Sequence, residues 1–143
     1  MYQASAENWG DTRFIATTRH SCFVMDTQGK GANPVDTLLA ALCSCMGHHV
    51  REYFVAKGSP RAAFLVSAGS DTAREAPKLS GISVQIGVSP IRLSPPEQAE
   101  LLAEVQKCKV YGTLRQACRI DIVVINGETQ TLTDSAPKGV THA

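Results

Sequence analysis

One long helical segment constrains the fold more than any other part of this sequence. Asp36–Lys57 contains no proline, and its apolar side chains recur at helical spacing. Its first half, Leu38 to Met46, is apolar almost all round, with Ser44 as the clear polar member. A helix of this kind is buried on every side, either by its own chain or by a partner chain. The sequence predicts that this helix ends at Gly58-Ser59-Pro60.

Short β-type runs lie on both sides of this helix. The predicted strands are Thr12–Thr17, Ser21–Asp26, Ala63–Ser67, Ile82–Val88 and Arg119–Ile125. A second helix is predicted to open at Ser94-Pro95-Pro96-Glu97, which combines a capping serine, an early proline and a capping-box glutamate, and to reach Cys108. Tyr111–Ala117 is predicted to be a connector, and Asn126-Gly127 a turn before a short strand to Leu132. This grouping of elements favours an α+β fold.

The length and net charge of the chain indicate how many domains it has and which partners it is not expected to bind. The 143 residues fit a single domain, 1–143, in which we expect residues 134–143 to be a frayed tail. The net charge is only +1 and the basic residues are scattered, so neither nucleic acid nor an anionic membrane is an expected partner. No apolar run approaches the ~20 residues of a membrane span, and the first residues lack a signal-peptide pattern. We therefore expect a cytoplasmic protein.

The cysteines are the residues that could carry chemistry. An odd count of five argues against a disulfide framework in a protein that is not secreted. Cys45 lies within the apolar helix and Cys108 at the end of the second helix, whereas Cys22 and Cys118 are predicted to be core residues. A cysteine in an apolar helix is more often a small core residue than a nucleophile, because burial raises the pKa of a thiol. To act as a thiolate, Cys45 needs a cation from elsewhere in the fold.

The run Gly31-Ala32-Asn33-Pro34-Val35-Asp36-Thr37-Leu38-Leu39-Ala40-Ala41-Leu42-Cys43-Ser44-Cys45 resembles the signature of the OsmC/Ohr family, the osmotically inducible and organic hydroperoxide resistance proteins. In that family a Gly-x-Asn-Pro loop leads into an apolar, Ala-rich helix and then to the peroxidatic cysteine. At the family's spacing from the Asn-Pro loop, the peroxidatic cysteine corresponds to Cys45 and not to Cys43. A second family cysteine lies after the second helix, and Cys108 occupies the matching place. The order of elements is similar over most of the chain.

The resemblance implies both a fold and an activity. The fold is OsmC-like, with two main helices packed against antiparallel sheet in an intertwined homodimer. The activity is that of a peroxidase in the oxidative stress response, which needs no cofactor and reduces organic hydroperoxides. Cys45 would become a sulfenic acid, and Cys108 would resolve it to a disulfide that a small dithiol or thioredoxin-like reductant reopens.

Two other family residues have only approximate counterparts. The family holds its thiolate with an arginine from the N-terminal part, for which Arg13 and Arg19 are candidates. Arg19 is preferred because it lies in a predicted turn, although either can be a solvated charge. The family carboxylate corresponds to Val35, and the neighbouring Asp36 is the substitute. Asp36 can equally serve as an acid in the first turn of the helix.

Two alternatives follow from these departures and from His48 and His49. A catalytically silent OsmC-like protein could bind a small apolar or thiol ligand in the same pocket. The histidines lie three and four residues after Cys45 on its side of the helix, where one of them could bind a metal with it or stabilise its thiolate. A hydrogen-bonded histidine in the core or at a subunit contact is the simplest interpretation, because no second ligand pair occurs at zinc-site spacing.

Overall fold

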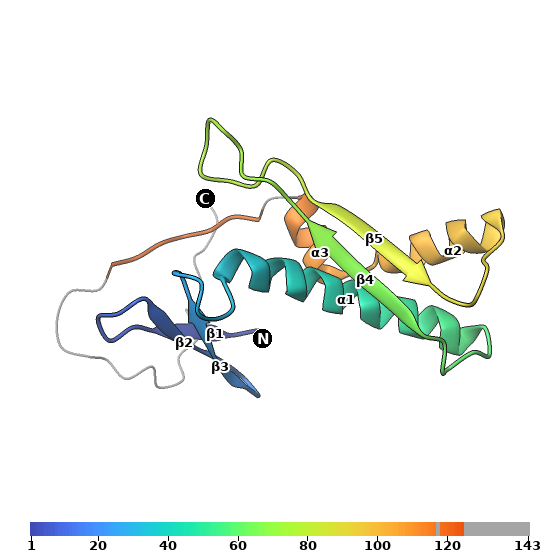
Figure 1. Ribbon diagram of the computed structural model, residues 1–143, viewed down its shortest axis with the longest axis horizontal. Helices are drawn as coiled ribbons and strands as arrows, with labels where there is room; N and C mark the ends of the chain where they lie inside the picture. The colour runs from blue at the N-terminus through green and yellow to red at the C-terminus, as the bar shows by residue number, and fades with distance from the viewer. Residues whose placement is uncertain (117, 125–143) are drawn as a thin grey trace, which may run out of the picture.

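The computed structural model describes residues 1–116 and 118–124, and it has the predicted α+β architecture (Figure 1). Its elements in chain order are β1 (Ala4–Glu7), β2 (Arg13–Thr18), β3 (Cys22–Asp26), α1 (Pro34–Ala56), β4 (Phe64–Gly69), β5 (Ser83–Val88), α2 (Pro95–Val105) and α3 (Lys109–Arg115). The described strands form two antiparallel sheets, β1-β2-β3 and β4-β5. Within these residues no helix is long and apolar enough to cross a membrane.

Helix α1 is the long helix predicted from the sequence, and local chemistry sets both of its ends. The side chain of Asn33 accepts a hydrogen bond from the Val35 N–H at 2.8 Å, and proline follows in the first turn. At the other end Gly58 has a φ of +77°, which glycine adopts readily. Its N–H bonds to the Val55 carbonyl, and the N–H of Ser59 bonds to the Phe54 carbonyl. This hydrogen-bond pattern is a Schellman motif. The Asn-Pro loop therefore fixes where α1 begins, and Gly58 fixes where it ends.

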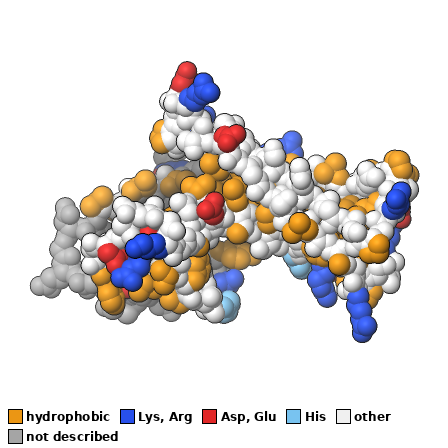
Figure 2. Space-filling model, in the orientation of Figure 1, with side chains coloured by type: hydrophobic (Ala, Val, Ile, Leu, Met, Phe, Trp, Pro, Cys, Tyr) orange, Lys and Arg blue, Asp and Glu red, His pale blue; other side chains and the backbone are white. Residues whose placement is uncertain are grey.

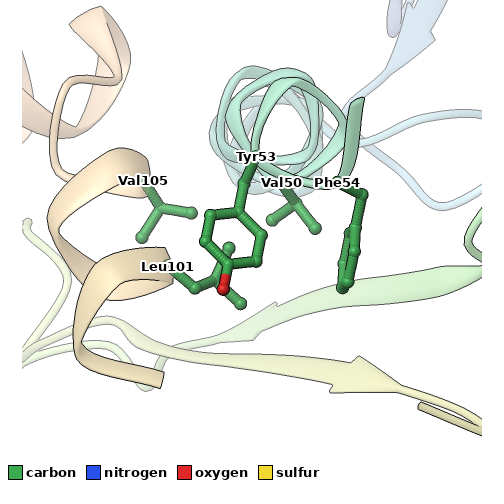
Figure 3. Close-up of a cluster of buried hydrophobic side chains, with 5 residues drawn as sticks. All are labelled: Val50, Tyr53, Phe54, Leu101 and Val105. Atoms are coloured by element: carbon green, nitrogen blue, oxygen red, sulfur yellow. The ribbon is translucent and has the colours of Figure 1, made fainter. Parts of the chain in front are cut away.

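The hydrophobic core lies where α1 meets α2 and the β4–β5 hairpin. Figure 3 shows its five buried side chains, contributed by α1 and α2, and they are Val50, Tyr53, Phe54, Leu101 and Val105. Val50 is completely buried. Alternate residues of β4 and β5, among them Phe64 and Ile86, pack against this cluster from the hairpin side. The two main helices and the hairpin therefore form one packed unit.

The N-terminal sheet stands apart from that unit. Its strands pair with one another but make few contacts with the helices (Figure 1). The first strand, Ala4–Glu7, was not predicted, because Ala-Ser-Ala-Glu has little intrinsic preference for a strand; pairing with β2 forms it. Cys22, on the outer strand β3, is exposed, so the prediction of a core position is wrong. Among the described strands none pairs with the outer edge of β3, which is met only by an isolated bridge between Met25 and Ala32.

The chain after α2 differs most from the prediction. A short helix, α3, replaces most of the predicted connector, and residues 119–124 of the predicted strand Arg119–Ile125 form neither helix nor strand. Among the described residues no strand pairs with this segment. Four of its side chains are 78 to 86% exposed, namely Ile120, Ile122, Val123 and Val124. Cys118 is also exposed rather than in the core. Ile125, the predicted turn and return strand, and residues 134–143 lie outside the described residues.

Candidate active site

Two of the cysteines meet although they are far apart in sequence. Cys45 lies in the middle of α1 and is half-buried, while Cys108 is the N-cap of α3 and is only 1% exposed. Cys45 packs against the buried cluster that contains Cys108, and the pKa of Cys108 is raised in part by Cys45. Because α3 packs on α1, its first residues lie against the helix that carries Cys45. The structure thus brings together the two thiols that the sequence had singled out.

A tight turn places Cys108. Helix α2 ends at Val105, and the backbone N–H of Cys108 bonds to the Val105 carbonyl at 3.2 Å. The chain then starts α3, in which the Tyr111 N–H donates to the Cys108 sulfur at 3.3 Å. Cys108 is therefore not the last residue of the second helix, as predicted, but the cap of the third. The sulfur serves as the N-cap acceptor that a serine or aspartate oxygen usually provides.

The surroundings of the thiol pair are apolar. Leu42 and Met46 of α1 are buried with Cys108, and side chains from the hairpin and α3 complete the cluster. Burial raises the pKa of Cys108, and its interaction with Cys45 raises it further. The Tyr111 and Val110 amides act in the opposite direction and lower this pKa. Cys108 is consequently a protonated thiol at neutral pH, and it can form a disulfide only as the minor thiolate form.

The proposed arginine and carboxylate are not at the thiols in the described structure. Arg13 pairs with Asp11, their Nη2 and Oδ2 atoms 2.5 Å apart, and this hydrogen bond raises the pKa of the arginine. Asp36 lies exposed in the first turn of α1. It precedes Cys45 by about 14 Å along the helix axis at 1.5 Å per residue. Its position suits the helix dipole better than a contact with the thiols.

Arg19 is linked to the residue beside Cys108 through Tyr2, which no sequence pattern marks as part of the site. Its guanidinium carbon is 4.9 Å from the centre of the Tyr2 ring. The Nζ of Lys109, the residue after Cys108, is 5.5 Å from the same centre and 3.4 Å from the Tyr2 hydroxyl. Tyr2 thus connects the β2–β3 turn to the start of α3. An aromatic residue near a chain terminus gives no sequence signal for such a contact.

His49 forms a contact between α1 and α2. Its Nδ1 lies 3.4 Å from Oε1 of Glu104, and both side chains are partly buried. His48 is exposed, with its ring edge-on to that of His49 at 5.4 Å between centres. Among residues 1–116 and 118–124, no three His, Cys, Asp or Glu side chains come together as a metal site. His49 is therefore a hydrogen-bonded histidine between two helices, as in the simplest interpretation of the sequence.

The fold and the motif are those of known proteins. The family model described as OsmC-like protein matches residues 27–123. An OsmC-like protein from Mycoplasma pneumoniae has a similar structure, with a TM-score of 0.68 and 21% identity over 82% of this chain and 89% of that chain. OhrB, the organic hydroperoxide resistance protein of Bacillus subtilis, has a TM-score of 0.57 and 12% identity over 82% of this chain and 92% of that chain.

A third similar structure is an organic hydroperoxide resistance protein OsmC from Legionella pneumophila. Its TM-score is 0.57 and its identity 16%, over 80% of this chain and 89% of that chain. A comparison with curated protein sequences found no match. At these identities the similar structures establish the fold alone, whereas the family model covers about two-thirds of the sequence, including both cysteines of the thiol pair. On that match, the chain belongs to the OsmC-like protein family.

Proposed function

We propose that this protein is a thiol-dependent peroxidase that reduces organic hydroperoxides at Cys45 and resolves the product with Cys108. The observation that carries the proposal is that these two side chains lie together in one apolar cluster, where Cys45 contributes to the raised pKa of Cys108. Two thiols held in one cluster are placed to form a disulfide with each other. The hydroperoxide resistance function in the names of two structurally similar proteins supports the same chemistry.

The reaction would proceed in two steps. The Cys45 thiolate attacks the outer peroxide oxygen, the O–O bond breaks, and the alkoxide leaves as an alcohol after taking up a proton. Cys45 is then a sulfenic acid. Cys108 attacks its sulfur, an S–S bond forms, and the S–O bond breaks with release of water. A small dithiol or a thioredoxin-like protein would reduce the disulfide and return both thiols.

The apolar surroundings suggest which peroxide is reduced. Leu42 and Met46 contact the thiol pair, together with partly buried side chains from β5 and α3. These groups favour the hydrocarbon part of an organic hydroperoxide over hydrogen peroxide, because burial of apolar surface adds binding free energy. The reaction of free thiols also suits a reducing compartment, and we propose that the protein acts in the cytoplasm.

We propose further that the chain, a single OsmC-like domain over 1–143, works as an intertwined homodimer. Orange side chains are prominent around the N-terminal sheet in Figure 2, and the exposed ones there include Trp9, Phe23 and Val24. The first turns of α1 expose Val35 and Leu38 as well. Apolar groups distributed in this way are typical of surfaces that a second copy covers.

One observation favours a second candidate function. Within the described residues Arg13 is paired with Asp11 and Arg19 lies over Tyr2, so neither guanidinium holds the Cys45 thiolate. An OsmC-like protein without an activating cation at its thiol would be a poor peroxidase. Such a protein could bind a small apolar or thiol ligand at the same apolar cluster.

Hydroperoxide consumption decides between the two functions. The reduced protein is mixed with an organic hydroperoxide and a dithiol, beside the Cys45→Ser and Cys108→Ser variants. A peroxidase turns over, loses its activity in Cys45→Ser, and accumulates sulfenic acid with slow recycling in Cys108→Ser. A wild-type protein that is inert while its thiols are verified as reduced contradicts the peroxidase and favours the ligand-binding function.

A further inference from the structure

Three polar contacts join α1 to α2 along the line where the two helices meet. The Tyr53 hydroxyl donates to the Glu97 carbonyl at 3.3 Å, and Lys57 Nζ lies 2.6 Å from Glu100 Oε2. The third is the contact between His49 and Glu104. It is the one nearest to the thiols, because His49 lies one helical turn after Cys45 and Glu104 lies four residues before Cys108. The other two contacts lie farther along both helices.

Glu104 is held on both of its carboxylate oxygens. Oε1 contacts His49 at 3.4 Å, and Oε2 contacts Lys107 Nζ at 2.5 Å. Hydrogen bonds from Lys107 and then from His49 lower the pKa of Glu104, so the side chain is a carboxylate at neutral pH. A carboxylate can accept from both neighbours at once, whereas an amide at this position would turn its NH₂ group towards one of the two donors.

The same glutamate also fixes the turn that leads to Cys108. The Lys107 N–H bonds to the Glu104 carbonyl at 3.1 Å, so Lys107 is attached to Glu104 through both its backbone and its side chain. Cys108 is the next residue. Helix α1, which carries Cys45, and the turn, which carries Cys108, are therefore connected through a single carboxylate.

We propose that His49, Glu104 and Lys107 form a positioning bridge that holds Cys108 against Cys45 and sets the rate at which their disulfide closes. The bridge contacts neither sulfur, so its members act through the geometry of the thiol pair. This assignment builds on the proposed use of the two cysteines, but the geometry that it explains is independent of any peroxide. Loss of the bridge should slow the second thiol step and leave the first unaffected.

An aromatic disulfide reagent can measure the two steps separately in the full-length chain. The parent protein carries Cys22→Ser, Cys43→Ala and Cys118→Ser, so that only the thiol pair reacts. Attack of the Cys45 thiolate breaks the S–S bond of the reagent, forms a mixed disulfide and releases one coloured aromatic thiolate. Attack of Cys108 on the Cys45 sulfur then closes the protein disulfide and releases the second aromatic thiolate.

The chain provides a matched control for the key substitution. Glu104→Gln and Glu100→Gln are the same chemical change one helical turn apart on α2, and each removes a charge that faces α1. For the other partner, His49→Leu removes the hydrogen-bonding ring. His49→Asn places an amide nitrogen near the position of Nδ1 and keeps a donor for Glu104. Circular dichroism and urea unfolding verify that each variant is folded.

If the bridge positions Cys108, Glu104→Gln and His49→Leu should each release the second aromatic thiolate about tenfold more slowly than the parent. This factor is equivalent to ~1.4 kcal/mol of activation free energy. The first release should stay within about twofold of the parent, which a general loss of stability would not explain. Glu100→Gln should leave both phases unchanged, and His49→Asn should recover most of the second rate.

Three outcomes would overturn the bridge. In the first, the parent protein releases only one equivalent of aromatic thiolate. In the second, the second release in both Glu104→Gln and His49→Leu stays within about twofold of the parent rate. In the third, Glu100→Gln slows the second release as much as Glu104→Gln does. Failure of the peroxidase proposal gives a different pattern. A protein that is inert towards hydroperoxides but shows two releases, with the second slowed by Glu104→Gln, keeps the bridge and loses only its proposed use.

Discussion

Raising the pH from 7 to 9 should accelerate the attack of Cys108 on an oxidised Cys45 more than it would accelerate an exposed thiol. The reason is that only the thiolate attacks, and burial raises the pKa of Cys108 above its ordinary value. For an exposed thiol with a pKa of about 8.5, the thiolate fraction grows about 25-fold over this range and flattens near pH 9. A raised pKa increases this growth, which has an upper limit of about 100-fold over two pH units, and it moves the flattening to higher pH.

The second release of aromatic thiolate measures this rate, because the leaving group has the same charge at every pH of the series. Burial, the largest cause of the raised pKa, persists when Cys45 carries the reagent, although the interaction between the two thiols is lost. Cys108→Ser serves as the control and should release a single equivalent at each pH. A rate that flattens near pH 9, with a total rise of about 25-fold or less, would refute the assignment of a raised pKa to the buried thiol.

The other predictions concern stability and can be measured by urea unfolding. Val50→Ala should lower the free energy of unfolding by about 2 to 3 kcal/mol, since Val50 is completely buried and a cavity adds to the lost transfer energy; a loss below about 1 kcal/mol would contradict the packing. Gly47→Ala should raise it by about 0.5 to 1 kcal/mol, because the new methyl group meets Phe64 and Val66 at 3.6 and 3.9 Å, ordinary contact distances. Ser94→Ala should cost about 1 kcal/mol, since it removes the capping serine of α2, and no change would mean that the cap is dispensable. The reduced wild type should lose stability above about pH 8.5, by up to about 1.4 kcal/mol per pH unit relative to Cys108→Ala, because the unfolded thiol ionises first and the unfolded chain then binds fewer protons than the folded chain; parallel pH curves for the two proteins would exclude this linkage.

The predicted features that the structure bears out were those with local chemical causes. The proline after Asn33 and the glycine at position 58 define α1, and a capping serine opens α2. Elements without such signals were missed. Strand β1 forms because β2 offers it a pairing edge, and α3 begins at a cysteine, which is not a usual capping residue.

Extended segments were the weakest part of the sequence prediction. The alternating apolar residues of 119–124 match a strand pattern, but a strand also needs a partner, and the described chain provides none at that place. The candidate site, too, was predictable only in part. Sequence resemblance singled out Cys45 and Cys108, but neither spacing nor composition could place Glu104 between a histidine of α1 and a lysine beside Cys108.

The placement of Cys45 beside Cys108 has a thermodynamic consequence for the whole chain. A bond there closes a loop of about 60 residues, and the lost entropy of the unfolded chain would make the oxidised protein about 4 kcal/mol more stable than the reduced one. Folding and oxidation form a thermodynamic cycle of four states, the folded and the unfolded chain with the disulfide open or closed. The free energy by which the disulfide stabilises the fold therefore equals that by which the fold stabilises the disulfide against reduction. The reduction potential of the pair and the stability of the fold are then coupled, with about 30 mV for every 1.4 kcal/mol. A substitution that weakens the oxidised fold alone would therefore make the disulfide easier to reduce, even when it lies far from either sulfur.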